Sequence, residues 1–240
     1  MGSAGYFIFE TMLSLLLAIA PGVAICLFVY SRDRYEKEPL IGLVISFLLG
    51  MLCTFIPLLA QWIAGDLLGA RRHIFLSYAV FAYLVVALSE EGSKFLMLRF
   101  YAYPKRIFNE PFDGIVYSVM IGMGFATVEN IEYVLHYGVR TGLVRFFLSV
   151  PAHAAFAVLM GYYVGLARFN REDAAWLMGK GLLIAVFFHG SFDLCIFLQQ
   201  NKEITRYIST GLLSFGAFAS FYIAVRLAMR SIRIYRVSPK

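Results

Sequence analysis

The chain has 240 residues, of which 60% are hydrophobic and 15% charged, and its mean hydropathy is +0.74. A soluble domain carries about 25% charged residues, so this composition excludes an ordinary soluble protein and indicates an integral membrane protein. The net charge of +6 comes from loops and a basic tail and gives no case for nucleic-acid binding.

Seven apolar segments follow one another along the chain, each near or above the ~20 residues that cross a bilayer as a helix. They are predicted at residues 6–30, 40–64, 74–100, 112–137, 144–169, 174–199 and 204–230. The connectors are too short to fold separately. We therefore expect one all-α, polytopic transmembrane domain over residues 1–240, with the lipid bilayer as its surroundings.

The distribution of Lys and Arg predicts how the chain is oriented. With seven helices, thirteen of these residues fall on one side and six on the other, and two within helices account for the rest of the 21. Because Lys and Arg concentrate in cytoplasmic loops, we expect the N-terminus outside and the C-terminus in the cytoplasm.

Ionisable and other strongly polar side chains gather in the interiors of four consecutive predicted helices, between residues 74 and 199, and the other three helices have almost nothing comparable in their interiors. The set is Glu90, Glu91 and Lys94 at 74–100; Asp113, Glu129, Asn130 and Glu132 at 112–137; His153 at 144–169; and His189 and Asp193 at 174–199. Charged groups within a membrane are costly and mark functional sites by default. Any chemistry is therefore expected in the helices at 74–199.

Spacing predicts how these groups pair. Glu90 and Lys94 are four residues apart and share one helix face, which leaves Glu91 about 100° round the helix, toward a neighbour. His189 and Asp193 have the same spacing, which suits a carboxylate that orients an imidazole. Each feature also has a structural alternative. The Glu90–Lys94 pair would then serve only to neutralise charge so that its helix can insert into the membrane, and His153 would be only a hydrogen-bonded packing residue.

Small residues recur at four-residue steps in two of these helices. They are Gly114, Ser118, Gly122 and Ala126 at 112–137, and Gly161 and Gly165 at 144–169. Such stripes allow helix backbones to approach closely in membranes. We expect close packing beside the polar groups.

Two glutamates and two histidines suit hydrolysis by an activated water. A membrane-buried carboxylate can act as a general base, and the imidazoles can stabilise an oxyanion or hold a divalent metal with a glutamate. The chain has no G-x-S-x-G and no H-E-x-x-H motif. We favour a metal-free site because no two histidines are close in sequence; zinc is the alternative, with Glu91, Glu129, His153 and His189 as candidate ligands.

Five sequence stretches, taken in order, resemble the PrsW family of intramembrane proteases. They are "RDRYEKEP" with Asp33, Tyr35, Glu38 and Pro39; "EEGSK" at 90–94; "DGIVYSVMIGMGFATVEN" at 113–130; His153 after a proline; and "HGSFD" at 189–193. In the wider group, which includes CAAX-prenyl proteases and bacteriocin-immunity proteins, an Arg follows the glutamate pair. Here Phe95 takes that place and Lys94 precedes it, which favours the PrsW branch.

The resemblance implies a multi-pass protease of the bacterial plasma membrane. Its substrate would be a single-pass anti-sigma factor, cut first at the extracytoplasmic side. Glu90, Glu91, His153 and His189 would be catalytic, with Lys94, Glu129, Asn130 and Asp193 in supporting roles. Two other function classes stay open from the residues alone: a proton- or cation-coupled transporter, and a non-catalytic immunity or scaffold protein.

The predicted topology also sets the depth of the site. At ~1.5 Å per residue from the outer helix ends, Glu129 lies about 12 Å deep, His153 about 13 Å and His189 about 15 Å. Glu90 lies several ångströms deeper. We therefore expect the site to open toward the outer half of the bilayer.

Overall fold

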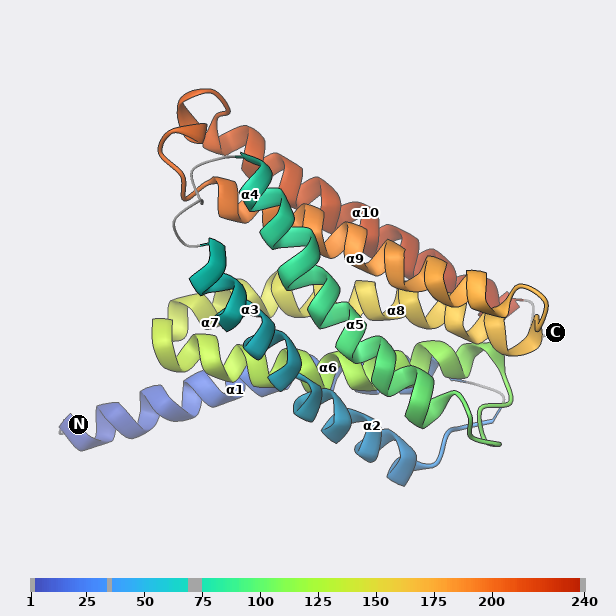
Figure 1. Cartoon of the computed structure of the whole chain (residues 1–240). Helices are drawn as coiled ribbons and strands as arrows, with labels where there is room; N and C mark the ends of the chain where they lie inside the picture. Colours follow the sequence, from blue (N-terminus) through green and yellow to red (C-terminus); the bar gives the residue numbers. More distant parts are fainter. Residues whose placement is uncertain (1–2, 34–35, 69–74, 238–240) are drawn as a thin grey trace.

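The computed structural model of the chain is all-helical and describes residues 3–33, 36–68 and 75–237 (Figure 1). Within these residues, seven helices are long and apolar enough to cross a membrane. Their apolar spans are Phe9–Arg32, Leu40–Gly65, Phe75–Ala102, Pro111–Tyr137, Val139–Phe169, Ala174–Leu198 and Thr210–Tyr235. The prediction of an all-α fold with seven spans is confirmed. Tyr35, from the first sequence stretch, lies outside the described residues.

Three of the seven spans consist of more than one helical element. In chain order the elements are α1 (Ser3–Arg32), α2 (Leu40–Cys53), α3 (Phe55–Leu68), α4 (Phe75–Val80), the π-helix η2 (Phe81–Ala87), α5 (Leu88–Met97), the π-helix η3 (Leu98–Ala102), α6 (Pro111–Tyr137), α7 (Val139–Phe147), α8 (Ser149–Phe169), α9 (Ala174–Leu198), the 3₁₀ turn η4 (Ile204–Arg206) and α10 (Thr210–Val237). The last span therefore begins at residue 210 and not at 204.

Helix α6 lies at the centre of the bundle and is almost wholly buried (Figure 1). It packs against α8, α2 and α1, and α9 packs on α8. The small-residue stripes make the α6–α8 contact: a Cβ placed on Gly114 would lie 2.3 Å from the Gly161 carbonyl oxygen, and one on Gly122 2.9 Å from the Ala157 Cβ. The predicted close approach of these helices is confirmed.

Two prolines, Pro57 and Pro151, each divide a span that is predicted from the sequence as one continuous helix. Proline has no N–H and its ring clashes with the carbonyl four residues earlier. That carbonyl belongs to Cys53 for Pro57 and to Phe147 for Pro151, and α2 and α7 end at these two residues. The predicted helices at 40–64 and 144–169 are therefore each two helices.

The third span contains two π-helical stretches, η2 and η3, on either side of α5. Within η2, the Tyr83 hydroxyl lies 2.7 Å from the Ser191 hydroxyl of α9. The Tyr83 ring also fills the space beside Gly190, where a Cβ would lie 2.4 Å from ring carbon Cδ1. This contact brings η2 directly against the part of α9 that carries His189.

A buried polar cluster joins the first loop to the start of α6. The Tyr117 hydroxyl donates to the Glu38 carboxylate, and the Glu38 amide donates to Asp33 Oδ2 at 3.4 Å. Asp113, at the start of α6, accepts through Oδ2 from the Glu110 amide at 2.7 Å and from the Asn109 amide at 2.8 Å.

We expect this cluster to make stability depend on pH. Burial raises the pKa of Glu38 above its ordinary value of 4.5, and the nearby Asp33 carboxylate acts in the same direction. The folded state thus binds a proton at the Glu38 carboxyl group more tightly than the unfolded state does. Its contribution to the free energy of unfolding is complete below pH 4.5 and is lost as pH rises through the folded pKa.

The thermal midpoint of the purified protein should therefore fall as pH rises from about 5 to about 8. The variant Glu38→Gln should flatten this dependence, because the amide oxygen still accepts from Tyr117 and carries no charge. Glu172→Gln, an exposed change in the loop between α8 and α9, is the control. A slope unchanged in Glu38→Gln would contradict the role of this carboxyl group.

Candidate active site

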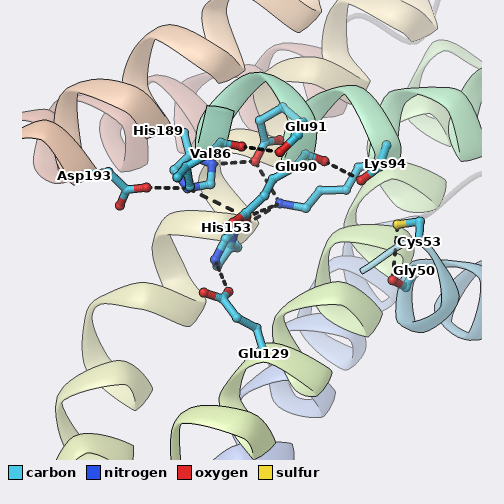
Figure 2. A network of polar contacts seen from close by, with 12 residues as sticks. Gly50, Cys53, Val86, Glu90, Glu91, Lys94, Glu129, His153, His189 and Asp193 are labelled. Atoms are coloured by element: carbon cyan, nitrogen blue, oxygen red, sulfur yellow. Dashed lines mark hydrogen bonds and ion pairs between the residues drawn. The ribbon is translucent and has the colours of Figure 1, made fainter. Parts of the chain in front are cut away.

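Helix α5 carries Glu90, Glu91 and Lys94 into the core, where all three are at least 96% buried (Figure 2). Lys94 Nζ lies 2.8 Å from Glu91 Oε1 and 3.7 Å from Glu90 Oε2. The predicted pair of Glu90 and Lys94 is present, but the shorter contact is with Glu91. The ammonium thus neutralises a pair of carboxylates that would otherwise repel each other in an apolar core.

His189 joins this group from α9. Its Nδ1 lies 2.8 Å from Glu91 Oε1, and its Nε2 lies 3.2 Å from Asp193 Oδ2 and 3.8 Å from Glu90 Oε2. The prediction that Asp193 contacts His189 one turn earlier is confirmed. Glu91 Oε1 therefore holds Lys94 and His189 together.

His153 enters from α8 on the opposite side of Lys94. Its Nδ1 lies 3.2 Å from Lys94 Nζ, and its Nε2 lies 2.9 Å from Glu129 Oε2 on α6. Both imidazoles thus point Nδ1 toward the centre of the cluster and Nε2 toward an outer carboxylate, as Figure 2 shows. An outer carboxylate of this kind fixes the ring orientation and tautomer of a functional histidine.

Four side chains meet at one point in this arrangement. Glu90, Glu91, His153 and His189 each offer one nitrogen or oxygen atom, and these atoms lie within 4.8 Å of one another. The Phe156 ring stacks on His189 at a centroid distance of 5.2 Å. The four residues predicted as catalytic therefore lie together, although their roles remain a prediction.

A cavity of about 550 Å³ reaches this cluster. The cluster residues that line it are Glu90, Glu129, His153, His189 and Asp193; among the described residues, Glu91 and Lys94 are not part of its lining. Its other walls come from α3, the end of α6, α7 and α9. Of the two adjacent glutamates, Glu90 is the one that a molecule in the cavity would meet.

Two residues that contact this site, Gln61 and Arg145, were not predicted from the sequence. Gln61 of α3 donates from Nε2 to Glu90 Oε1 at 3.4 Å. Arg145 of α7 lies 3.0 Å from Glu129 through Nη2, and its Nε donates to Asn130 Oδ1 at 2.6 Å. Asn130 thus supports the site through Arg145. The sequence did offer one indication of Arg145: it lies inside the predicted apolar helix at 144–169, where a charged side chain needs a partner.

The four central residues fit a divalent metal by type and spacing. Carboxylate oxygens and imidazole nitrogens are ordinary ligands of zinc. Glu90 Oε2 and Glu91 Oε2 are buried without a hydrogen-bond partner among the described residues. Lys94 supplies a positive charge to the same two carboxylates.

The sequence profile of the family described as "PrsW family intramembrane metalloprotease" matches residues 38–227. The chain belongs to the PrsW family. It is thus an intramembrane protease and a multi-pass membrane protein with bacterial relatives, and the transporter and scaffold alternatives are set aside.

Several proteins named protease PrsW are similar to the chain over most of their length. The one from Geobacillus kaustophilus is 39% identical over 191 residues, which cover 79% of this chain and 83% of the relative. The one from Bacillus subtilis is 35% identical, covering 76% and 82%, and the one from Clostridioides difficile is 35% identical, covering 79% and 81%. No solved structure matches the chain. PrsW-family membership therefore rests on sequence, and the geometry on this structure.

Metal content tests the metal-free prediction made from the sequence. We expect the purified PrsW-family protein to hold much less than one zinc ion per chain, because the Lys94 ammonium already neutralises Glu91 at 2.8 Å. Lys94→Met should raise the zinc content, since it removes the competing cation and leaves the ligands. Elemental analysis and isothermal titration measure both. Stoichiometric zinc in the wild-type protein, with activity lost to a chelator and restored by zinc, would contradict the prediction.

Proposed function

We propose that this protease hydrolyses a peptide bond in a single-pass membrane protein of the anti-sigma-factor class, at or just inside its extracytoplasmic boundary. The observation that carries the proposal is the division between the two glutamates. Glu90 lines the cavity, whereas Glu91 is fully buried behind it and bonds Lys94 and His189 through Oε1.

In this proposal Glu90 is the general base. It takes a proton from a water molecule in the cavity as the water oxygen attacks the scissile carbonyl carbon, and later gives that proton to the leaving amine. His153 and His189 line the same cavity and stabilise the negative charge that develops on the carbonyl oxygen. A divalent metal held by Glu90, Glu91, His153 and His189 would supply activation of a bound water and polarisation of the carbonyl.

The remaining polar residues hold these groups in position. Glu91 fixes His189 and Lys94 through one oxygen, Asp193 fixes the other side of His189, and Glu129 fixes His153. Because each histidine is held from both sides, little reorganisation is needed when charge develops during the reaction.

Reconstituted proteolysis tests the proposal. The purified protein would be placed in lipid vesicles with candidate single-pass proteins, including the anti-sigma factors of a bacterium that carries it. We expect cleavage at one bond near the extracytoplasmic end of the substrate helix. Cleavage only within soluble loops far from the bilayer, or equal cleavage by a Glu90→Gln variant, would overturn it.

We also propose that the cavity opens in the outer half of the membrane, on the side where α6 ends and α7 begins. The proposal rests on the Lys and Arg distribution, because most of these residues lie in the loops at the opposite end of the bundle.

Cysteine labelling checks this orientation. In a background that lacks Cys26, Cys53 and Cys195, a reagent that cannot cross membranes should label Arg140→Cys on intact cells and should not label Arg106→Cys. Both positions are exposed, and they lie at opposite ends of α6. The reverse pattern would place the cavity on the cytoplasmic side and exclude extracytoplasmic cleavage.

A further inference from the structure

Arg145 is a mostly buried cation on α7, the short helix between α6 and α8. Its side chain is 12% exposed, whereas Arg140 on the same helix α7 is exposed. A mostly buried arginine needs partners for its charge and its donors. The partners of Arg145 therefore indicate what it does.

All three partners lie on α6, at the end that borders the cavity. Arg145 Nη2 lies 3.0 Å from Glu129 Oε2, and Nε donates to Asn130 Oδ1 at 2.6 Å. The guanidinium carbon lies 4.0 Å from the centre of the Tyr133 ring. The planar guanidinium group is thus held by an ion pair, a hydrogen bond and a cation–π contact, which together fix its orientation.

The contact with Glu129 connects Arg145 to the reacting groups. The oxygen that Arg145 contacts, Glu129 Oε2, is also 2.9 Å from His153 Nε2. His153 Nδ1 in turn lies 3.2 Å from Lys94 Nζ at the centre of the cluster. One carboxylate oxygen therefore lies between the arginine and the histidine.

Without Arg145, the Glu129 carboxylate would lose the cation that lies 3.0 Å from it. This carboxylate lines the cavity beside Glu90, and Lys94 is the other cation of the site that acts on it. We then expect the Glu129 carboxylate to turn toward the Lys94 ammonium, which in the intact site contacts Glu91, Glu90 and His153. Such a turn would weaken its 2.9 Å contact with His153.

We propose that Arg145 is a positioning residue for catalysis: it holds Glu129 in the orientation that keeps His153 pointing into the cluster. The proposal rests on the catalytic role proposed for His153, and it assigns to Arg145, which also lines the cavity, an effect on the reaction that passes through Glu129.

Steady-state kinetics of Arg145→Gln give the first test. We expect kcat to fall about 10- to 100-fold, the usual effect of losing a residue that orients a functional histidine, with KM within about twofold of the wild type. Arg145→Lys, which keeps the positive charge, should recover part of kcat. Arg140→Gln, with the same charge change on the same helix, should behave as the wild type does. A rise in KM with kcat unchanged would make Arg145 a substrate-binding residue and overturn the proposal.

The double variant Glu129→Gln/Arg145→Gln gives the second test and guards against misfolding. It removes both charges of the pair, so neither is left buried alone. If Arg145 acts through Glu129, the double variant should have the same kcat as Glu129→Gln. A further drop in kcat, beyond that of Glu129→Gln, would show that Arg145 acts elsewhere.

A spectroscopic measurement separates this proposal from the proposed function. The chain has four histidines, so the ¹⁵N ring signals of labelled protein can be assigned by substitution. In Arg145→Gln the His153 signals should shift and the His189 signals should stay. This result holds even if no single-pass substrate is cleaved. Unchanged His153 signals, or equal shifts in both histidines, would overturn the positioning role.

Discussion

Replacement of Glu90 by glutamine is expected to lower the rate of cleavage by about 10²- to 10⁴-fold, the usual contribution of a general base. The amide keeps the size of the side chain and its contact with Gln61, and Lys94 keeps its shorter bond to Glu91. The protein should therefore fold, and its thermal midpoint should stay close to that of the wild type. Single-turnover cleavage of a single-pass substrate measures the rate.

The neighbouring change Glu91→Gln should behave differently. It leaves the Lys94 ammonium with Glu90 as its remaining carboxylate at 3.7 Å, and breaking a buried pair in this way costs about 3–5 kcal/mol of stability. We expect loss of both activity and thermal stability. Glu172→Gln, in an exposed loop, controls for the change of net charge. Full activity in Glu90→Gln, together with inactivity of a stable Glu91→Gln, would exchange the roles assigned to the two glutamates.

Gly161→Ala should cause a large loss of stability for a single added methyl group at the α6–α8 contact. The added Cβ would lie 2.3 Å from the Gly114 carbonyl oxygen, so the two backbones must move apart. Overpacking of this kind costs about 1–3 kcal/mol or more. Because α6 carries Glu129 and α8 carries His153, we also expect kcat to fall.

The matched control is Gly179→Ala on α9, where an added Cβ meets nothing within 4 Å. This change should leave stability equal or raise it by up to about 1 kcal/mol, since alanine is the better helix former. Thermal unfolding in detergent and cleavage rate would be measured for both variants. Equal stability of Gly161→Ala and the wild type would mean that the helices can separate at this point without cost.

The spans and the residues of the site could be predicted because both depend on local composition. A run of about 20 apolar residues has one structural solution in a bilayer, and charges inside such runs must gather for mutual compensation. His189 and Asp193 were paired correctly because α9 is a regular helix between residues 174 and 198.

Which glutamate faces the cavity was not predictable in the same way. The π-helical stretch η2 ends three residues before Glu90, and a wider turn changes the direction in which every later side chain points. The partner of Lys94 was a separate difficulty: residues three and four apart both share a face of α5, so spacing placed Lys94 with Glu90, whereas its shorter contact is with Glu91. The helix breaks before α3 and α8 had a clear signal in Pro57 and Pro151, but a proline inside a membrane helix often only bends it.

The two proline breaks also determine where the bundle can bend. Thr54 and Pro57 at the first break, and Leu148 and Ser149 at the second, all line the cavity. Bending an intact helix requires the loss of backbone hydrogen bonds, each worth about 0.5–1.5 kcal/mol, whereas at a proline one of them is already missing. We therefore expect α3 to tilt more easily than α2, which is packed on α6, whereas α7 is tied to α6 through Arg145. The packed helices that carry Glu129 and His153 would then stay in place while the wall of the cavity formed by α3 bends at the first proline break.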